Sequence, residues 1–151
     1  MPPLKRILLA EDNPHDVELT LAALEEHHLA NEVVVVRDGA EALDYLYARG
    51  AYQGRGHELP AVLLLDLKMP KVDGLEVLRA VKGDPRTHAI PVVVLTSSRE
   101  ENDLVESYKL GVNAYIQKPV EFDSFRMAIK QLGLFWLVVN EPPPPSAFGP
   151  G

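Results

Sequence analysis

Five short apolar runs, separated by stretches with helical patterning, restrict this chain to an alternating α/β architecture. The runs cover residues 5–10, 32–36, 61–66, 91–96 and 114–117. Runs of this length that are apolar almost throughout are typical of parallel strands buried on both faces. Because strands and helices alternate with short connections, the pattern predicts a (βα)₅ chain. Right-handed crossovers then give a doubly wound parallel sheet of five strands with helices on both faces.

The stretches between the runs carry the signals of helix starts. Asn13 can cap a helix that begins at Pro14, and Asp16 then lies in the first turn, where a carboxylate is favourable. Ser97 or Ser98 can cap the helix that follows the fourth run. The last helix is expected to dock through a stripe at steps of three and four residues. That stripe consists of Phe122, Phe125, Ile129, Leu132 and Trp136.

Four of the runs end in residues that could take part in phosphoryl transfer. These are Glu11-Asp12 after the first run, Asp66 in the third, Thr96 in the fourth and Lys118 after the fifth. The carboxyl ends of parallel strands meet at one edge, where open α/β sheets place their ligand sites. Three acids, a hydroxyl and an ammonium at that edge suggest a phosphorylation site that depends on Mg²⁺, a cation that favours carboxylate and phosphate oxygens.

Composition and charge exclude several function classes. The chain has 151 residues, 46% apolar and 25% charged, which suits one soluble domain with a real core. Its net charge of −7 disfavours nucleic-acid binding, because phosphate backbones attract cations. The lack of cysteine excludes disulfides and thiolate zinc sites. Since no apolar stretch approaches the ~20 residues of a membrane span and no signal peptide is visible, we expect a cytoplasmic protein without a membrane partner.

The C-terminal end differs in composition from the rest of the chain. Residues 141–151 hold five of the prolines and two glycines, so we expect a Pro-rich disordered tail after a single domain over residues 1–140. The segment Leu134–Val139 just before the tail is apolar on every side of the expected helix. One core cannot bury a helix all round, so this segment favours a partner surface; the alternative is a terminal turn that folds back over the domain.

Together, the strand-end residues resemble the receiver domain of two-component response regulators, over about Lys5 to Trp136. The residues that carry the resemblance are Glu11-Asp12, Asp66 with Pro70 and Gly74 behind it, Thr96, and Lys118-Pro119. The resemblance implies the flavodoxin-like strand order 2-1-3-4-5, which places the first and third strands side by side. That order brings the acids at the two strand ends together.

A narrower resemblance points to the small regulators paired with bacterial phytochromes. It rests on the long loop before the third strand, on residues 66–71 and 91–96, and on Phe135-Trp136-Leu137. It implies a regulator without an attached output domain, with a sensor histidine kinase of the bacteriophytochrome class as phosphoryl donor. A homodimer through Phe135, Trp136 and Val139 is also expected, together with a downstream protein that the sequence does not identify.

The family resemblance also gives the acids their roles. Asp66 would be the phosphoacceptor, since a carboxylate can take a phosphoryl group to form an acyl phosphate. Glu11 and Asp12 would hold Mg²⁺ together with Asp66 and the backbone carbonyl of Lys68. Read alone, Asp66 could be a turn or capping residue, and Glu11 and Asp12 could belong to a capping cluster. An acid that ends an apolar strand beside two other acids is too costly for that without a cation.

Three further residues would respond to phosphorylation. Lys118 would pair with Asp66 before the reaction and with a phosphoryl oxygen after it, next to a cis bond at Pro119. Thr96 would donate its hydroxyl to the phosphoryl group, and Tyr115 would swing into the space vacated. The surface that changes is then the face of the fourth helix, fifth strand and fifth helix. Each residue also has a structural reading: a surface lysine, a strand-end threonine and a static, half-buried ring.

Three other functions fit parts of the pattern. A phosphatase with an aspartate nucleophile, the enzyme alternative, would want another acid where Lys68 stands. A flavin carrier on this fold needs a hydroxyl-rich phosphate loop after the first strand, where Glu11-Asp12 would repel the phosphate. A degenerate receiver used only for docking does not need the complete set of site residues. We therefore expect a phosphoacceptor signalling protein rather than an enzyme.

Overall fold

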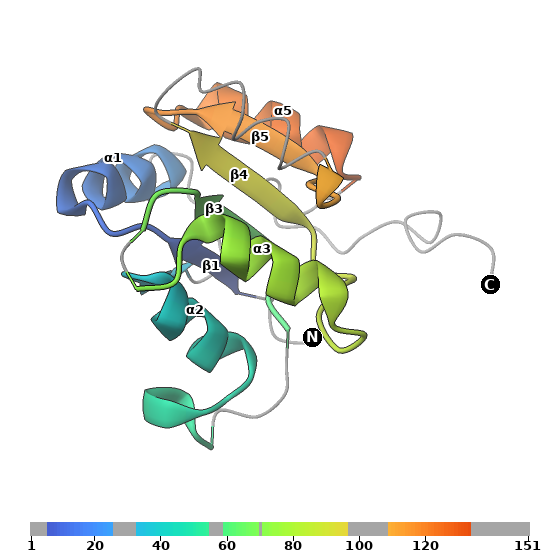
Figure 1. Ribbon diagram of the computed structural model, residues 1–151. Helices are drawn as coiled ribbons and strands as arrows, with labels where there is room; N and C mark the ends of the chain where they lie inside the picture. Colours follow the sequence, from blue (N-terminus) through green and yellow to red (C-terminus); the bar gives the residue numbers. More distant parts are fainter. Residues whose placement is uncertain (1–5, 26–32, 55–58, 70, 97–108, 134–151) are drawn as a thin grey trace, which may run out of the picture.

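The computed structural model describes residues 6–25, 33–54, 59–69, 71–96 and 109–133, with the backbone alone of residue 96. Along these ranges strands and helices alternate as far as the fourth strand, and the fifth strand and the last helix follow after the gap at residues 97–108 (Figure 1). The strands are β1 (Ile7–Ala10), β2 (Val33–Val36), β3 (Val62–Asp66), β4 (Val92–Thr96) and β5 (Ala114–Gln117). The helices are α1 (Pro14–Glu25), α2 (Gly39–Leu46), α3 (Gly74–Gly83) and α5 (Phe122–Gln131), with a 3₁₀ helix, η1, at Gly50–Tyr52.

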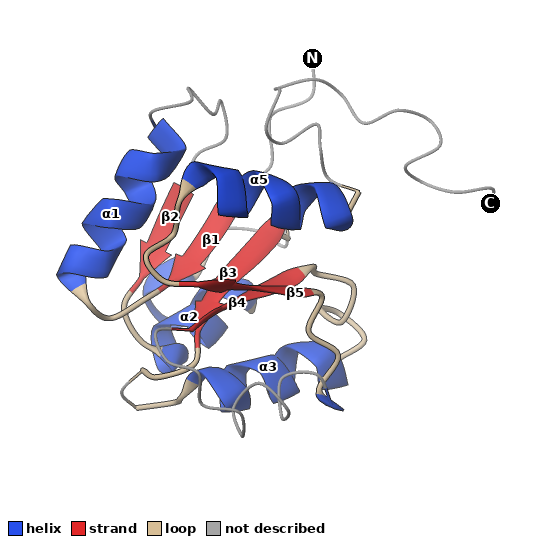
Figure 2. Ribbon diagram, turned by 90° about the horizontal axis from the view of Figure 1, so that it is seen from above, coloured by secondary structure: helices blue, strands red, loops and turns tan. Residues whose placement is uncertain are grey.

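The strands form one parallel sheet in the order β2-β1-β3-β4-β5, which confirms the expected strand order. In the middle of the sheet, Ala10 of β1 pairs with Val36 on one side and with Leu65 on the other. Helices α1 and α5 cover one face, and α2 and α3 cover the opposite face (Figure 2). The predicted doubly wound α/β fold is therefore confirmed.

The core consists of two layers, one on each face of the sheet. Alternate residues of a strand enter opposite layers: Leu9 and Leu64 pack with Phe125 of α5, whereas Leu8 and Leu63 pack on the side of α2 and α3. All these side chains are fully buried. Because β1 and β3 are covered on both faces, they are apolar at every position except Asp66 at the end of β3, which is the pattern seen in the sequence.

Three helices begin just after the carboxyl end of a strand or its loop, each with a side-chain cap. The Asn13 Oδ1 accepts hydrogen bonds from the N–H groups of His15 (2.9 Å) and Asp16 (3.1 Å), which confirms Asn13 as the cap of α1. Asp38 caps α2 and Asp73 caps α3 in the same way. These caps fix the starts of the helices at the carboxyl edge of the sheet, close to the expected site.

Helix α5 docks through the predicted stripe. Phe125 and Ile129 are fully buried, and Phe122 and Leu132 pack partly buried against the same core layer. Trp136 of the stripe, the helix expected after β4 and the Pro-rich tail fall outside the described residues. Among the helices that are described, none combines the length and the apolar character needed to span a membrane.

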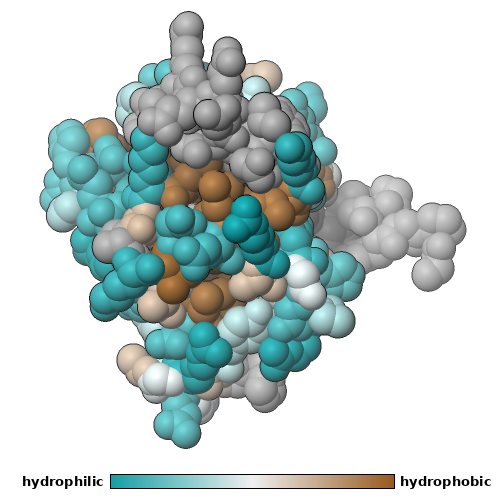
Figure 3. Space-filling view, in the orientation of Figure 1, coloured by the Kyte–Doolittle hydropathy of each residue, from teal (hydrophilic) through white to brown (hydrophobic). Residues whose placement is uncertain are grey.

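The described surface is largely hydrophilic on the face drawn in Figure 3, with apolar side chains gathered in one central area. Among the described residues, the large apolar or aromatic side chains that are clearly exposed are Leu19, Tyr115 and Met127. They lie on three different elements, α1, β5 and α5. Single exposed side chains of this kind are normal for a folded domain and do not by themselves define an interface.

Gly74, the first residue of α3, lies against the backbone at the end of β3. A Cβ at this position would lie 2.3 Å from the Asp66 carbonyl oxygen and 2.5 Å from the Leu67 Cα. Because both neighbours are backbone atoms, Gly74→Ala forces α3 or the end of β3 to move. We expect the substitution to lower the free energy of unfolding by about 1–3 kcal/mol, as overpacking does elsewhere, measured by chemical denaturation.

Gly83→Ala, at the other end of the same helix, is the matched control. A Cβ at Gly83 would meet no heavy atom of the described residues within 4 Å. Alanine also favours helix over glycine, so we expect no loss and a gain of at most about 1 kcal/mol. If the two substitutions change stability equally, the close approach of α3 to the end of β3 is wrong.

Candidate functional site

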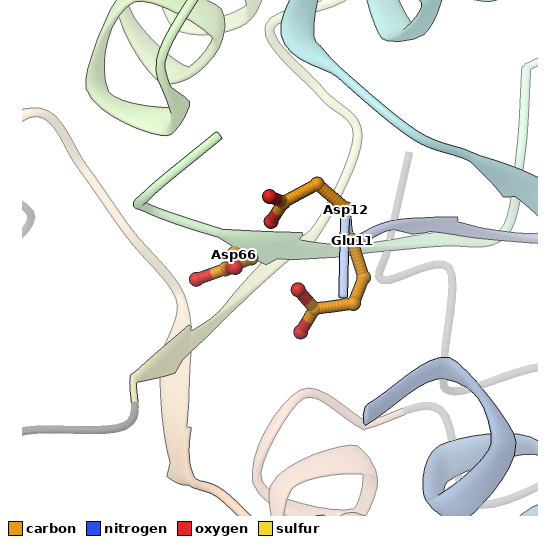
Figure 4. A group of neighbouring side chains, drawn as sticks. All are labelled: Glu11, Asp12 and Asp66. Carbon is orange, nitrogen blue, oxygen red and sulfur yellow. The ribbon is translucent and has the colours of Figure 1, made fainter. Parts of the chain in front are cut away.

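Three carboxylates meet at the carboxyl edge of the sheet, where β1 and β3 end side by side. Glu11 and Asp12 directly follow β1, and Asp66 is the last residue of β3. One carboxylate oxygen of each lies within 4.8 Å of the others (Figure 4). The parallel register, which pairs Ala10 with Leu65, causes this meeting. We refer to these three residues as the acid cluster.

Backbone hydrogen bonds fix the acid cluster to its strands. The Glu11 N–H donates to the Val36 carbonyl oxygen of β2 (3.0 Å), and the Glu11 Oε2 accepts from the Asn13 N–H (3.3 Å). The Lys68 N–H donates to the Asp66 Oδ1 (3.3 Å). Glu11 is 0% exposed and Asp66 is 5% exposed. Two buried carboxylates beside a third are unfavourable unless a cation neutralises them.

Lys118, just after β5, supplies one cation. Its Nζ lies 2.7 Å from the Glu11 Oε1, 3.0 Å from the Asp16 Oδ2 and 3.4 Å from the Asp66 Oδ2. An ammonium has three N–H donors, so each carboxylate takes one. The Lys118 side chain is only 8% exposed, and the Lys118-Pro119 bond is cis, as the resemblance implied. The nearest partner of Lys118 is thus Glu11, and Asp66 is the most distant of the three.

The carboxylates of the site carry more negative charge than the single Lys118 ammonium can balance. Burial, helped by a hydrogen bond with Asp66, raises the pKa of Glu11 to about 7, although Lys118 opposes the shift. Burial also disfavours the charged form of Lys118, but its hydrogen bonds with Glu11 and Asp16 outweigh this and raise its pKa. One lysine therefore does not neutralise the acids around it. A small divalent cation with oxygen ligands fits the acid cluster, and Mg²⁺ has that preference.

The family follows from a match over most of the chain. The model of the response regulator receiver domain matches residues 7–130, from the start of β1 to within α5. The chain belongs to the receiver domain family. Both the strand order and the positions of the acid cluster at the strand ends agree with this membership.

Two curated proteins are similar to this receiver domain over nearly their full lengths. The probable methanogenesis regulatory protein FilR2 of Methanothrix harundinacea is 41% identical over 140 residues, which cover 93% of this chain and 88% of FilR2. Response regulator Rcp1 of Synechocystis is 38% identical over 135 residues, which cover 89% of this chain and 90% of Rcp1. Both relatives carry regulatory names.

Solved structures of phytochrome-associated regulators have the same fold. The bacteriophytochrome response regulator AtBRR is 65% identical, with a TM-score of 0.85, over 93% of this chain and 100% of its own. The Mn²⁺-bound form of Rcp1 is 40% identical, with a TM-score of 0.73, over 88% and 94%. Phosphorylated RcpA, a cyanobacterial phytochrome response regulator, is 44% identical, with a TM-score of 0.74, over 89% and 95%.

Of the remaining predicted residues, Thr96 and Tyr115 lie on the β4–β5 side of the sheet. Thr96 ends β4 and pairs with Gln117 of β5, while its side chain falls outside the description. Tyr115 lies on β5 and is 45% exposed. Lys68 is exposed in the loop after β3. The expected dimer residues Phe135, Trp136 and Val139 lie outside the described part of the chain.

Sequence reasoning assigned Asp16 only a helix-start role and missed its contact with Lys118. Asp16 lies in the first turn of α1, and its Oδ2 accepts a hydrogen bond from the Lys118 Nζ. One available signal was that Asp16 lies in the first turn of α1, shortly after the end of β1. Side chains of a helix tilt toward its N-terminus, which here points Asp16 back toward the end of β1, where the acid cluster lies.

Proposed function

We propose that this receiver domain accepts a phosphoryl group on Asp66 from a phosphohistidine of a sensor histidine kinase. The observation that carries the proposal is the meeting of the acid cluster with the Lys118 ammonium at one edge of the sheet. We assign the binding of Mg²⁺ to the acid cluster and to the backbone carbonyl of Lys68. These hard oxygen donors suit Mg²⁺, which commonly keeps its other positions for water and phosphate oxygens.

In the transfer, an Asp66 carboxylate oxygen attacks the phosphorus atom. The N–P bond of the donor breaks, its electron pair returns to the histidine nitrogen, and an acyl phosphate forms on Asp66. Mg²⁺ supplies charge neutralisation when bound. The Lys118 Nζ, 3.4 Å from the Asp66 Oδ2, supplies a second positive charge for the phosphoryl oxygens. The protein thus works by positioning and electrostatics as a phosphoacceptor, not as an enzyme for a separate substrate.

The signal leaves the site through the β4–β5 side of the sheet. A phosphoryl group adds about −1.5 to −2 charges at the edge of the sheet. In our proposal Thr96 donates its hydroxyl to that group, and Tyr115 turns inward from its half-exposed position on β5. The surface that partners read consists of β5, α5 and the helix expected after β4, which lies outside the described residues.

The similar structures support a phytochrome kinase as the phosphoryl donor. AtBRR is described as a bacteriophytochrome response regulator, and RcpA as a phosphorylated phytochrome response regulator. We therefore assign a bacteriophytochrome as the kinase partner. We also propose that the protein acts in the cytoplasm. We retain a receiver domain over residues 1–140 followed by a Pro-rich tail. We also retain a homodimer through Phe135, Trp136 and Val139, and a downstream protein partner.

The test is the intact mass of the protein after incubation with acetyl phosphate, in Mg²⁺ or in a chelator. We expect a phosphate adduct in Mg²⁺ and none in the chelator, with the adduct mapped to Asp66 by peptide mass analysis. A second incubation replaces acetyl phosphate with a phosphorylated bacteriophytochrome kinase. The absence of an adduct with both donors would reject the phosphoacceptor function and leave a docking module.

A further inference from the structure

Asp16 contacts the phosphorylation site without belonging to the acid cluster. Its Oδ2 lies 3.0 Å from the Lys118 Nζ, closer than the 3.4 Å between Lys118 and Asp66. The carboxylates that come within 4.8 Å of one another are those of Glu11, Asp12 and Asp66, and Asp16 is not among them. Lys118 therefore has one carboxylate partner that is free of the proposed metal ligands.

We propose that Asp16 is a positioning residue that holds the Lys118 ammonium in place for phosphoryl transfer. This inference rests on the proposed function, because Lys118 acts there on the phosphoryl oxygens. Asp16 lies outside the acid cluster and reaches the site through its hydrogen bond with Lys118, so the role we propose is exerted through Lys118. It is the third hydrogen-bond acceptor of an ammonium that has three donors.

Competition between cations explains why such an anchor is needed. Glu11 and Asp66 bind Lys118, and the same two carboxylates are the proposed ligands of Mg²⁺. A divalent cation on these oxygens weakens their attraction for the ammonium and also repels it. Lysine is a flexible chain with a point charge at its end, so the ammonium would then leave the site easily. In our proposal Asp16, which lies outside the acid cluster, retains its contact with Lys118 when the acid cluster is occupied.

The position of Asp16 is itself well fixed by the fold. Its backbone N–H donates to the capping oxygen of Asn13 at 3.1 Å, which holds the first turn of α1. The next residue, Val17, is 4% exposed and belongs to the core layer under α1 and α5. An anchor on a capped helix that is packed into the core restricts the ammonium more than one on a loop does.

The first test is a double-mutant cycle on the rate of phosphorylation by acetyl phosphate in saturating Mg²⁺. We expect Asp16→Asn to lower the maximal rate about three- to tenfold, within the range of coupled side chains, with little change in the half-saturating donor concentration. In a Lys118→Met background, Asp16→Asn should have no further effect, because the residue it positions is gone. Glu18→Gln removes one charge from the same helix and should leave the rate unchanged.

The second test reads the position of Lys118 directly, without phosphoryl donor or Mg²⁺. The ¹H–¹⁵N NMR signal of the Lys118 ammonium should be visible in the wild type, because hydrogen bonds and burial slow its exchange with water. We expect it to broaden or vanish in Asp16→Asn and to persist in Glu18→Gln. This measurement needs only single variants and stays decisive if Lys118→Met does not fold.

The outcomes separate this inference from the proposed function. If the wild type forms no phosphate adduct, the proposed function fails, whatever the NMR signal shows. If the wild type is phosphorylated but Asp16→Asn matches it in rate and in the ammonium signal, the role of Asp16 is wrong. An equal slowing by Asp16→Asn with and without Lys118 also overturns the role, since it indicates a general effect on α1.

Discussion

Asp66→Asn is expected to abolish the Mg²⁺-dependent phosphate adduct of this receiver domain. The amide has nearly the shape of the carboxylate, and its oxygen can still accept the Lys68 N–H that now binds the Asp66 Oδ1. It lacks the negative oxygen that attacks phosphorus and one of the charges of the acid cluster. Folding should therefore survive while the chemistry is lost. Intact mass after incubation with acetyl phosphate, with thermal unfolding of the same sample, measures both.

Asp123→Asn is the control for the charge change in that experiment. Asp123 is an exposed acid in the first turn of α5, and it is not a member of the acid cluster. We expect its variant to form the adduct at the wild-type level. A persistent adduct in Asp66→Asn would instead mean that another residue is the phosphoacceptor, and Asp12 of the acid cluster would be the next candidate.

The fold was predictable because each strand carries its own signal. β1 and β3 are buried on both faces, so their residues are apolar except Asp66 at the end of β3, and all five predicted strands are found. The ends differ by a residue or two: the first run was predicted to begin at residue 5 and β1 begins at Ile7. The apolar pattern does not predict the strand order, however, because the sequence of a central strand is apolar whichever strands lie beside it. That order came from the family resemblance.

The composition of the site was predictable to the extent that it depends on strand ends. Glu11, Asp12 and Asp66 follow directly from parallel strands in a known order. The partners of Lys118 depend instead on side-chain reach across the sheet. Glu11 rather than Asp66 is the nearest acceptor, and Asp16 is 102 positions away in sequence. No local pattern encodes such distances, because they depend on how the fold brings α1 and the residue after β5 together.

Glu11→Gln should raise the stability of the protein in a chelator at pH 8 while weakening its response to Mg²⁺. Burial raises the pKa of Glu11 from its usual 4.5 to about 7. The folded protein therefore holds the proton more tightly than the unfolded chain does. The stability linked to Glu11 is complete below pH 4.5 and is lost as the pH rises through 7. At pH 8 the wild type bears the cost of a buried carboxylate, and the glutamine variant does not.

We expect Glu11→Gln to gain about 1–3 kcal/mol at pH 8 in the chelator, seen as a melting temperature several degrees higher, and to lose this advantage at pH 4. In saturating Mg²⁺ the wild type should instead have the higher melting temperature. Mg²⁺ binding stabilises the wild type more, because the variant lacks the Glu11 carboxylate as a metal ligand. Glu18→Gln, an exposed change on α1, should show neither effect. A variant less stable than the wild type at pH 8 in the chelator would mean that the 2.7 Å ion pair with Lys118 outweighs burial of the Glu11 charge. In that case the ion pair with Lys118 would be enough to stabilise the charged form of Glu11 without Mg²⁺.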